Sequence, residues 1–228
     1  MKRIQSFFVL VALAGVSLLS SSCVFMGESP MSPEALQRRG LKPNEGYIVA
    51  TFHTKEVAPD SRIPRAGVLP SVHIKGESAT SSKIVSLIPI SIDGQNHPYF
   101  AGGGKPSVEL AIPVSAGDYK ITGWTLDNGQ IVIRNRKPLD VHFQVIPGKA
   151  TYIGSYLALS RYGRNLLGLP VLGDGVILVK DDFSTDRAKI PKKFPMIQAD
   201  SIRKSDVPRQ YQAEMKRIAD TPRLLGMF

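Results

Sequence analysis

The chain has 228 residues, a formal net charge of +10 at pH 7 and a single cysteine. A positive surface attracts anionic lipid head groups, acidic polysaccharide or nucleic acid. Nucleic acid is not an expected partner, because the densest basic clusters, "RNRK" at 134–137 and "PKKFP" at 191–195, lack the interleaved aromatic residues of single-strand binders.

Residues 1–22 predict an export signal. Lys2 and Arg3 precede an apolar run, "FFVLVALAGVSLL", whose length is that of a signal-peptide core. The run is too short to span a bilayer, which takes roughly 20 apolar residues. A buried first helix of the folded domain is the alternative, but the run shows no polar face at helical spacing.

Cys23 directly follows three serines at the end of this run. The arrangement resembles the lipobox of bacterial lipoproteins, in which the cysteine is diacylated and becomes the new N-terminus; Leu19 stands one position earlier than the usual leucine. Two or three acyl chains anchor firmly, because each buried methylene contributes about 0.8 kcal/mol. We therefore expect lipid attachment at Cys23, with ordinary cleavage after the serines as the alternative. Val24 in place of Asp indicates, in that family, the outer membrane facing the periplasm.

Residues 23–45 are rich in Ser, Pro, Gly and charge, with at most one turn of helix around 33–39, and read as a flexible tether. The following 46–197 segment has a comfortable size for one domain. It consists of short β-branched or aromatic segments separated by turn signals at 115–118, 127–129, 147–149 and 173–175. The pattern predicts an all-β antiparallel sandwich, with strands at 47–54, 71–76, 83–92, 107–114, 118–126, 130–135, 140–146, 150–159 and 175–180.

Strict alternation would place Tyr119 and Ile121 on one face of the 118–126 strand and Trp124 on the other, under a loop or at an edge. In the 150–159 strand it would set Ile153 opposite Tyr156. Both faces of that strand are apolar enough for a central position.

Two segments, "VSAGDY" at 114–119 and "FQVIPGKATYIG" at 143–154, resemble the "V-P-A-G-x-Y" turn and the "F-x-V-x-P-G-x-x-x-Y-I-G" hairpin of uncharacterised bacterial lipoproteins. Ser115 stands where that group has proline. The tail "VKDDFSTDRAKIPKKFPMI" also resembles the close of that group, a last strand followed by a short helix. The resemblance covers roughly 47–197 and implies an immunoglobulin-like or prealbumin-like sandwich; its motifs are structural.

Residues 198–228 form a predicted helical tail, with a helix over 205–220. Pro208 falls in the first turn, where its missing N–H does no harm, and Lys216 and Arg217 lie near the negative end of the helix dipole. One side carries a stripe of Val207, Tyr211, Met215 and Ile218. The stripe can pack on the sandwich or dock an envelope protein partner; disorder is the third possibility.

No catalytic motif stands out. "AGGGKPS" at 101–107 lacks the first glycine and the Ser/Thr of a phosphate-binding loop and is expected to be an inter-strand loop. The histidines are dispersed, with no zinc-binding spacing. His97 with Asp93 could meet a metal in a turn, although a polar loop tip is the simpler reading. No serine has the surroundings of a nucleophile elbow.

These observations predict a lipid-anchored β-sandwich of the cell envelope that serves as a non-catalytic binding or accessory module, as part of an envelope assembly. No catalytic, cofactor-binding or metal residue is expected, and no cofactor. The alternatives are a hydrolase acting on cell-wall glycan or peptide, with Asp93 and His97 at its site, and a plain structural lipoprotein.

Overall fold

The computed structural model describes residues 31–56, 68–77, 84–88, 107–164, 166–167 and 170–206. Several predicted features lie outside these ranges: the export signal, Cys23, the Asp93 and His97 pair, the 101–106 part of the glycine-rich loop and the 207–220 part of the helix predicted over 205–220.

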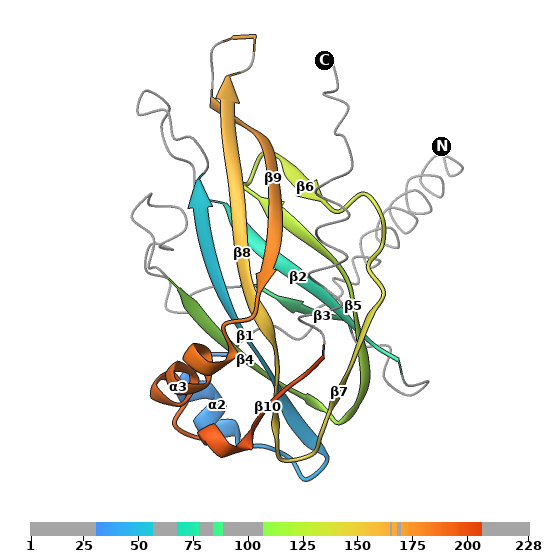
Figure 1. Cartoon of the computed structure of the whole chain (residues 1–228), viewed down its shortest axis with the longest axis vertical. Helices are drawn as coiled ribbons and strands as arrows, with labels where there is room; N and C mark the ends of the chain where they lie inside the picture. The colour runs from blue at the N-terminus through green and yellow to red at the C-terminus, as the bar shows by residue number, and fades with distance from the viewer. Residues whose placement is uncertain are drawn as a thin grey trace, which may run out of the picture.

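The described residues form two five-stranded sheets (Figure 1). Sheet A has the order β3 (Ile84–Leu87), β2 (Leu69–Gly76), β5 (Gly117–Asp127), with β6 (Val132–Arg134) and β7 (Val141–Val145) sharing the far edge of β5. Sheet B has the order β4 (Val108–Ser115), β1 (Glu45–Glu56), β8 (Ala150–Arg164), with β9 (Pro170–Lys180) and β10 (Ile202–Lys204) sharing the far edge of β8. The prediction of an all-β protein is confirmed, and each of the nine predicted strands overlaps an observed one.

The expected antiparallel arrangement is correct for sheet A and wrong for part of sheet B. Every pairing in sheet A is antiparallel. In sheet B, β1 runs parallel to β8, with Tyr47 opposite Ala150, and β10 also runs parallel to β8. Parallel neighbours need a long connection. Here the connection contains all five strands of sheet A, and local sequence patterns do not report the direction of such a distant pair.

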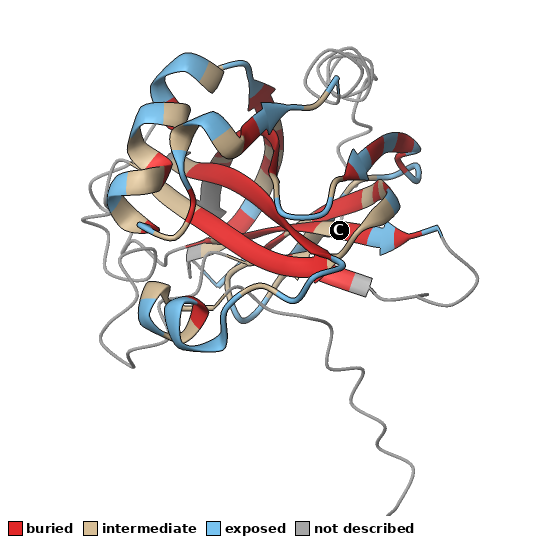
Figure 2. Cartoon of the chain, turned by 90° about the horizontal axis from the view of Figure 1, so that it is seen from below, coloured by how far each residue is buried: buried red, intermediate tan, exposed pale blue. Residues whose placement is uncertain are grey.

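A shared apolar core holds the two sheets face to face. Alternate residues of β1, namely Ile48, Ala50 and Phe52, point into it and are fully buried. The rings of Phe52 and Tyr156 stack there, with centroids 5.0 Å apart. Figure 2 shows burial along the strands at the middle of the molecule and exposure on the outer sides of the helices.

Two β-bulges overturn the expected alternation. In β5, the register against β2 skips Thr122, because His73 pairs with Gly123 and Ile74 with Ile121. An extra residue in one strand reverses the facing of every residue beyond it. Trp124 therefore lies in the inter-sheet core, 1% exposed, together with Ile121.

The second bulge lies in β8 at Gly154, whose φ of +128° is in the region that favours glycine. Val49 pairs with Tyr152, whereas Thr51 pairs with Ser155. The bulge places Ile153 and Tyr156 on the same inward face, although strict alternation would set them on opposite faces. Most of β8 is buried on both sides, as expected for a central strand.

Two helices cover the outer face of sheet B. They are α2 (Pro33–Arg39) and α3 (Phe183–Lys193), which is the short helix expected after the last long strand. A second apolar core lies between them and the sheet: Leu36, Tyr47, Val49, Ala111, Ala150, Tyr152, Ile190, Phe194, Ile197 and Ile202. Residues 31–45, which the sequence places in a flexible tether, are thus packed against the domain, and Leu36 is fully buried.

Local signals explain α2. The Ser32 side chain accepts a hydrogen bond from the Ala35 N–H, and Pro33 occupies the first turn. The Arg39 guanidinium donates to both carboxylate oxygens of Glu45, at 2.8 and 2.7 Å. This pair ties the helix to the start of β1, and the Arg39 hydrogen bonds lower the pKa of the buried Glu45.

The turn predicted at 147–149 is present, with Gly148 at φ +68°. It does not close the hairpin that the resemblance implies, because it carries the chain from β7 in sheet A to β8 in sheet B. The "GDG" segment at 173–175 lies inside β9, where Gly173 is the skipped residue of a third bulge. A glycine in a strand marks a bulge as readily as a turn. The turn at 127–129 is confirmed, with Gly129 at φ +83° between β5 and β6.

Candidate functional site

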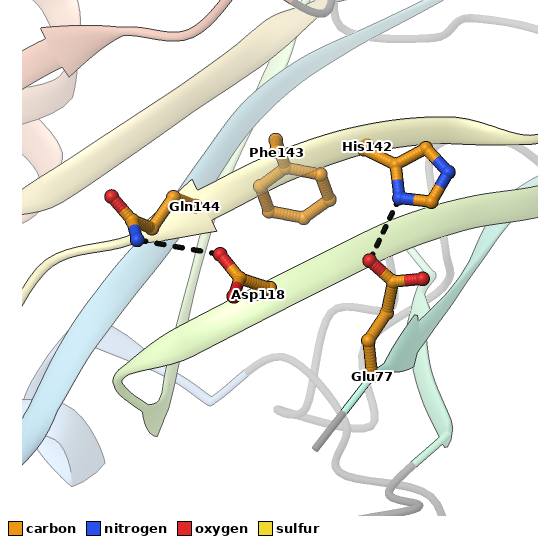
Figure 3. Close-up of a pocket in the computed structure, with 5 residues that line it drawn as sticks. All are labelled: Glu77, Asp118, His142, Phe143 and Gln144. Atoms are coloured by element: carbon orange, nitrogen blue, oxygen red, sulfur yellow. Dashed lines mark hydrogen bonds and ion pairs between the residues drawn. The ribbon is translucent and has the colours of Figure 1, made fainter.

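The outer face of sheet A carries an open recess of about 650 Å³ between the end of β2 and the paired strands β5 and β7 (Figure 3). Glu77, Asp118, His142, Phe143 and Gln144 line it. The pairing of β5 with β7 puts Asp118 opposite Gln144. The Glu77 N–H extends the sheet by donating to the Asp118 carbonyl at 2.9 Å, which brings Glu77 beside both strands.

His142 is the centre of the polar network. Its Nδ1 lies 2.7 Å from Glu77 Oε2, and its Nε2 lies 3.4 Å from Asp140 Oδ1. Lys120, opposite His142 in the ladder, donates to Asp140 at 3.1 Å. The hydrogen bond to Glu77 raises the pKa of His142. His142 therefore becomes protonated at a higher pH than an isolated histidine does. The recess gains one positive charge when the pH falls below this raised pKa.

The other end of the recess is held by one hydrogen bond to a carboxylate and by an aromatic contact. The Gln144 side-chain amide donates to Asp118 at 3.3 Å. Phe143 closes the recess from the core side, where its ring stacks on Tyr119 with centroids 5.8 Å apart. The Tyr119 hydroxyl in turn donates to the Ser115 carbonyl at 2.6 Å, across the connection between β4 and β5. On this side the recess thus rests on two buried, stacked aromatic rings.

The recess is acidic although the chain is basic. Glu77 and Asp118 line it beside the titrating His142. Asp140 and Lys120 are adjacent, where Asp140 pairs with both His142 and Lys120. Such a surface suits a ligand that carries a cationic group or several hydrogen-bond donors. Carboxylates lie near both ring nitrogens of His142. The arrangement therefore stabilises the protonated imidazolium and does not suit a histidine that transfers protons to a substrate.

The sequence pattern did not identify this recess. His142 was visible only as one of four dispersed histidines, and Glu77 lies 65 positions away from it. The available signal was the outward alternation of polar residues in "DVHFQV" beside "GDYK", but it names no ligand.

The remaining described histidines give no better site. His53 Nε2 lies 3.0 Å from Ser155 Oγ, but Ser155 is fully buried and cannot meet a substrate. His73 lies near Ser86, and burial lowers its pKa. Within the described ranges, no group of three His, Cys, Asp or Glu side chains, the His142 cluster included, has an arrangement that could hold a metal ion.

A buried polar cluster lies between α3 and sheet B. Asp186 is 1% exposed and accepts a hydrogen bond from the Tyr152 hydroxyl at 2.7 Å, while its Oδ1 has no hydrogen-bond partner. Thr51 lies near the carboxyl without forming an aligned hydrogen bond. Burial raises the pKa of Asp186 more than Tyr152 and Thr51 lower it. The cluster is inaccessible, so its importance is for stability.

Comparisons with known proteins assign no family. No protein-family model matches the chain, and neither does any curated protein. A leucine-rich repeat protein from Bacteroides thetaiotaomicron aligns with 49% of this chain and 13% of its own length, at 17% identity and a TM-score of 0.25. A candidate cell adhesion protein from Bacteroides fragilis aligns with 60% and 45%, at 10% identity and a TM-score of 0.27. Likeness at this level supports no statement about activity or partners.

Proposed function

We propose that this protein is a lipid-anchored component of the cell envelope, held at the outer membrane and facing the periplasm, and that it works as a non-catalytic binding or accessory module. The observation that carries the binding role is the acidic recess of sheet A, built on strands fixed by the inter-sheet core. The anchor rests on the sequence around Cys23. No described helix has the length and apolar character to cross a membrane.

The proposal extends to the fold type and the partner. We assign the two packed sheets to the immunoglobulin-like or prealbumin-like sandwich of the lipoprotein group that the sequence resembles. The ligand chemistry is that of the recess: a cationic or donor-rich group on an envelope component. The helix predicted over 205–220 would add a second contact within an envelope assembly.

We expect the mature chain to begin at Cys23 and to carry acyl chains. Intact-mass analysis of the protein purified from its own membranes should show the loss of residues 1–22 and added fatty acyl mass at the new N-terminus. The Cys23→Ser variant should lack that mass. A wild-type chain with an unmodified Cys23 would refute the lipid anchor. It would not affect the proposal that the recess binds a ligand.

A photoreactive residue at Gln144 should cross-link the ligand of the recess in intact envelopes. The matched control is the same residue at Gln198, an equally polar and exposed position away from sheet A. The Gln144 adduct should weaken about tenfold when Glu77→Gln and Asp118→Asn are combined, because charge-assisted hydrogen bonds to the ligand are lost. Identical adducts at both positions, or an adduct insensitive to the double change, would count against recognition in this recess.

A further inference from the structure

Three leucines lie on the outer face of sheet B, beyond the part that the helices cover. Tyr156 and Ala158 of β8 point into the inter-sheet core. Leu157 and Leu159 alternate with them and so point to the outer face. Leu178 lies directly opposite Leu157 in the ladder of β8 and β9 and therefore shares that face. Together the three side chains form the leucine face.

Within the described residues, the leucine face belongs to neither apolar core. All three of its side chains are half-buried. In Figure 1, α2 and α3 lie at the lower end of sheet B, and β8 and β9 extend well beyond them. Adjacent apolar side chains on an open sheet face favour docking of another element, because a cover removes their apolar area from water.

The chain after β10 is directed toward the leucine face. β10 runs parallel to β8, and the Ser205 N–H donates to the Tyr152 carbonyl at 3.1 Å. The chain is therefore heading along β8 toward the leucines at Asp206, where the described part ends. It cannot continue as a strand on this edge, because β9 occupies the edge from the pair of Lys180 with Ser155 onward. The following residues must leave the sheet edge close to the leucine face.

The segment that follows fits the leucine face in length and in apolar character. The apolar stripe of the helix predicted over 205–220 consists of Val207, Tyr211, Met215 and Ile218. Residues 207–220 would span roughly 21 Å as a helix. The 155–160 segment of β8, which carries two of the three leucines, spans roughly 17 Å. One helix of this length therefore covers the leucine face from end to end.

One pair of charges complements the apolar match. Glu214 lies within the stripe, because it follows Tyr211 by three residues and precedes Ile218 by four. Lys180 is exposed and stands two residues after Leu178, on the same face of β9. A carboxylate is costly against a purely apolar surface, whereas the ammonium group of Lys180 gives it a partner.

We propose that residues 207–220 form a helix that packs its apolar stripe on the leucine face and continues the layer begun by α2 and α3. Glu214 then pairs with Lys180. The opposite side of the helix, with Arg209 and Lys216, stays exposed for the envelope contact proposed above. The inference concerns sheet B and depends neither on the lipid anchor nor on the acidic recess.

The test places a photoreactive residue at Leu178 of the full-length chain in the cells that produce it. The expected product has the mass of one chain, with residue 178 cross-linked to the tryptic peptide 210–216. The matched control is the same residue at Val132, which is 58% exposed on sheet A and should give no such product. A cross-link to a second copy or to another protein, an equal product from position 132, or no product from position 178 would overturn the proposal.

Variants of the same photoreactive chain separate the apolar contact from the charge pair. Tyr211→Ser with Met215→Ser should lower the yield of the product about tenfold, because the apolar contact is lost. Gln212→Ser, outside the stripe, should leave the yield unchanged. Lys180→Gln should lower it about threefold by leaving Glu214 without a partner, and adding Glu214→Gln should restore most of it. A product that survives the loss of Tyr211 and Met215, or no rescue by Glu214→Gln, would contradict the proposed packing.

Discussion

Replacing Gly46 with alanine should lower the free energy of unfolding by about 3 kcal/mol. Gly46 lies near the start of β1, against the connection from β7 to β8. A Cβ at this position would lie 2.4 Å from the Ile146 carbonyl oxygen and 2.9 Å from the Lys149 carbonyl oxygen. Both are backbone atoms, so no side-chain rotation relieves the clash. The connection must move, and the hydrogen bond from the Tyr47 N–H to the Lys149 carbonyl, now 2.8 Å, would weaken.

Urea unfolding followed by tryptophan fluorescence measures the effect. The control is Gly40→Ala, where a Cβ would meet nothing within 4 Å and only the φ of +66° opposes the change. That variant should lose about 1 kcal/mol. If Gly46→Ala unfolds at the same urea concentration as the wild type, the close approach of β1 to the β7–β8 connection is not as described.

Replacing Asp186 with asparagine should stabilise the protein by about 1–2 kcal/mol at pH 8 and remove part of its pH dependence. The buried carboxyl has a raised pKa in the folded state, because burial disfavours its charge. Between the ordinary pKa of 3.8 and the raised one, the unfolded chain has lost a proton that the folded chain keeps. Stability therefore falls as the pH rises through this window. Asparagine carries no charge and can still accept the hydrogen bond from Tyr152.

Two further variants make the Asp186 experiment specific. Tyr152→Phe removes the one hydrogen bond to the carboxyl and should destabilise the protein, most strongly above the raised pKa. Asp200→Asn changes an aspartate whose side chain is 98% exposed and should have almost no effect. Lys189, which lowers the pKa of Asp186, and Asp182, which raises it, should be left unchanged. If the free energy of unfolding depends on pH in the same way for the wild type and Asp186→Asn, burial does not raise the pKa of this carboxyl.

The strands of this protein could be predicted from the sequence because each one carries its own local signal. β-branched and aromatic residues, bounded by Gly, Pro and Asn, identify a segment such as β1 or β4 without reference to the rest of the chain. The short helix α3 was likewise visible after the last long strand. These features depend on neighbours within about ten residues.

The relative direction of paired strands, and the face of the sheet on which each side chain lies, were not predictable in the same way. The parallel pairing of β1 with β8 is decided by contacts between distant residues, and alternation looks the same for either direction. One inserted residue at Thr122 moved Trp124 into the core, although the pattern around it suggested an edge. The helix α2 was assigned to a tether because only Leu36 and its neighbours in space reveal that it is packed.

The candidate site was missed for a related reason. His142, Glu77 and Lys120 come from three separate strands or strand ends, and they meet only because β2, β5 and β7 lie in one sheet. Asp93 and His97, the residues singled out in the sequence as possible chemistry, were chosen because they are close together along the chain. Such a criterion cannot find a cluster whose members come from strands far apart in the sequence.

The parallel pairing of β1 with β8 also has a consequence for how the chain matures. Tyr47 pairs with Ala150, which lies about one hundred residues downstream. The backbone groups on that edge of β1 therefore have no strand partner until β8 has been synthesised. Contacts of such long range form late, because a large loop has to close first. A nascent chain that stops short of β8 would present an unprotected strand edge, which is a template for aggregation. Truncated fragments should therefore need a holding chaperone until residue 150 has been synthesised.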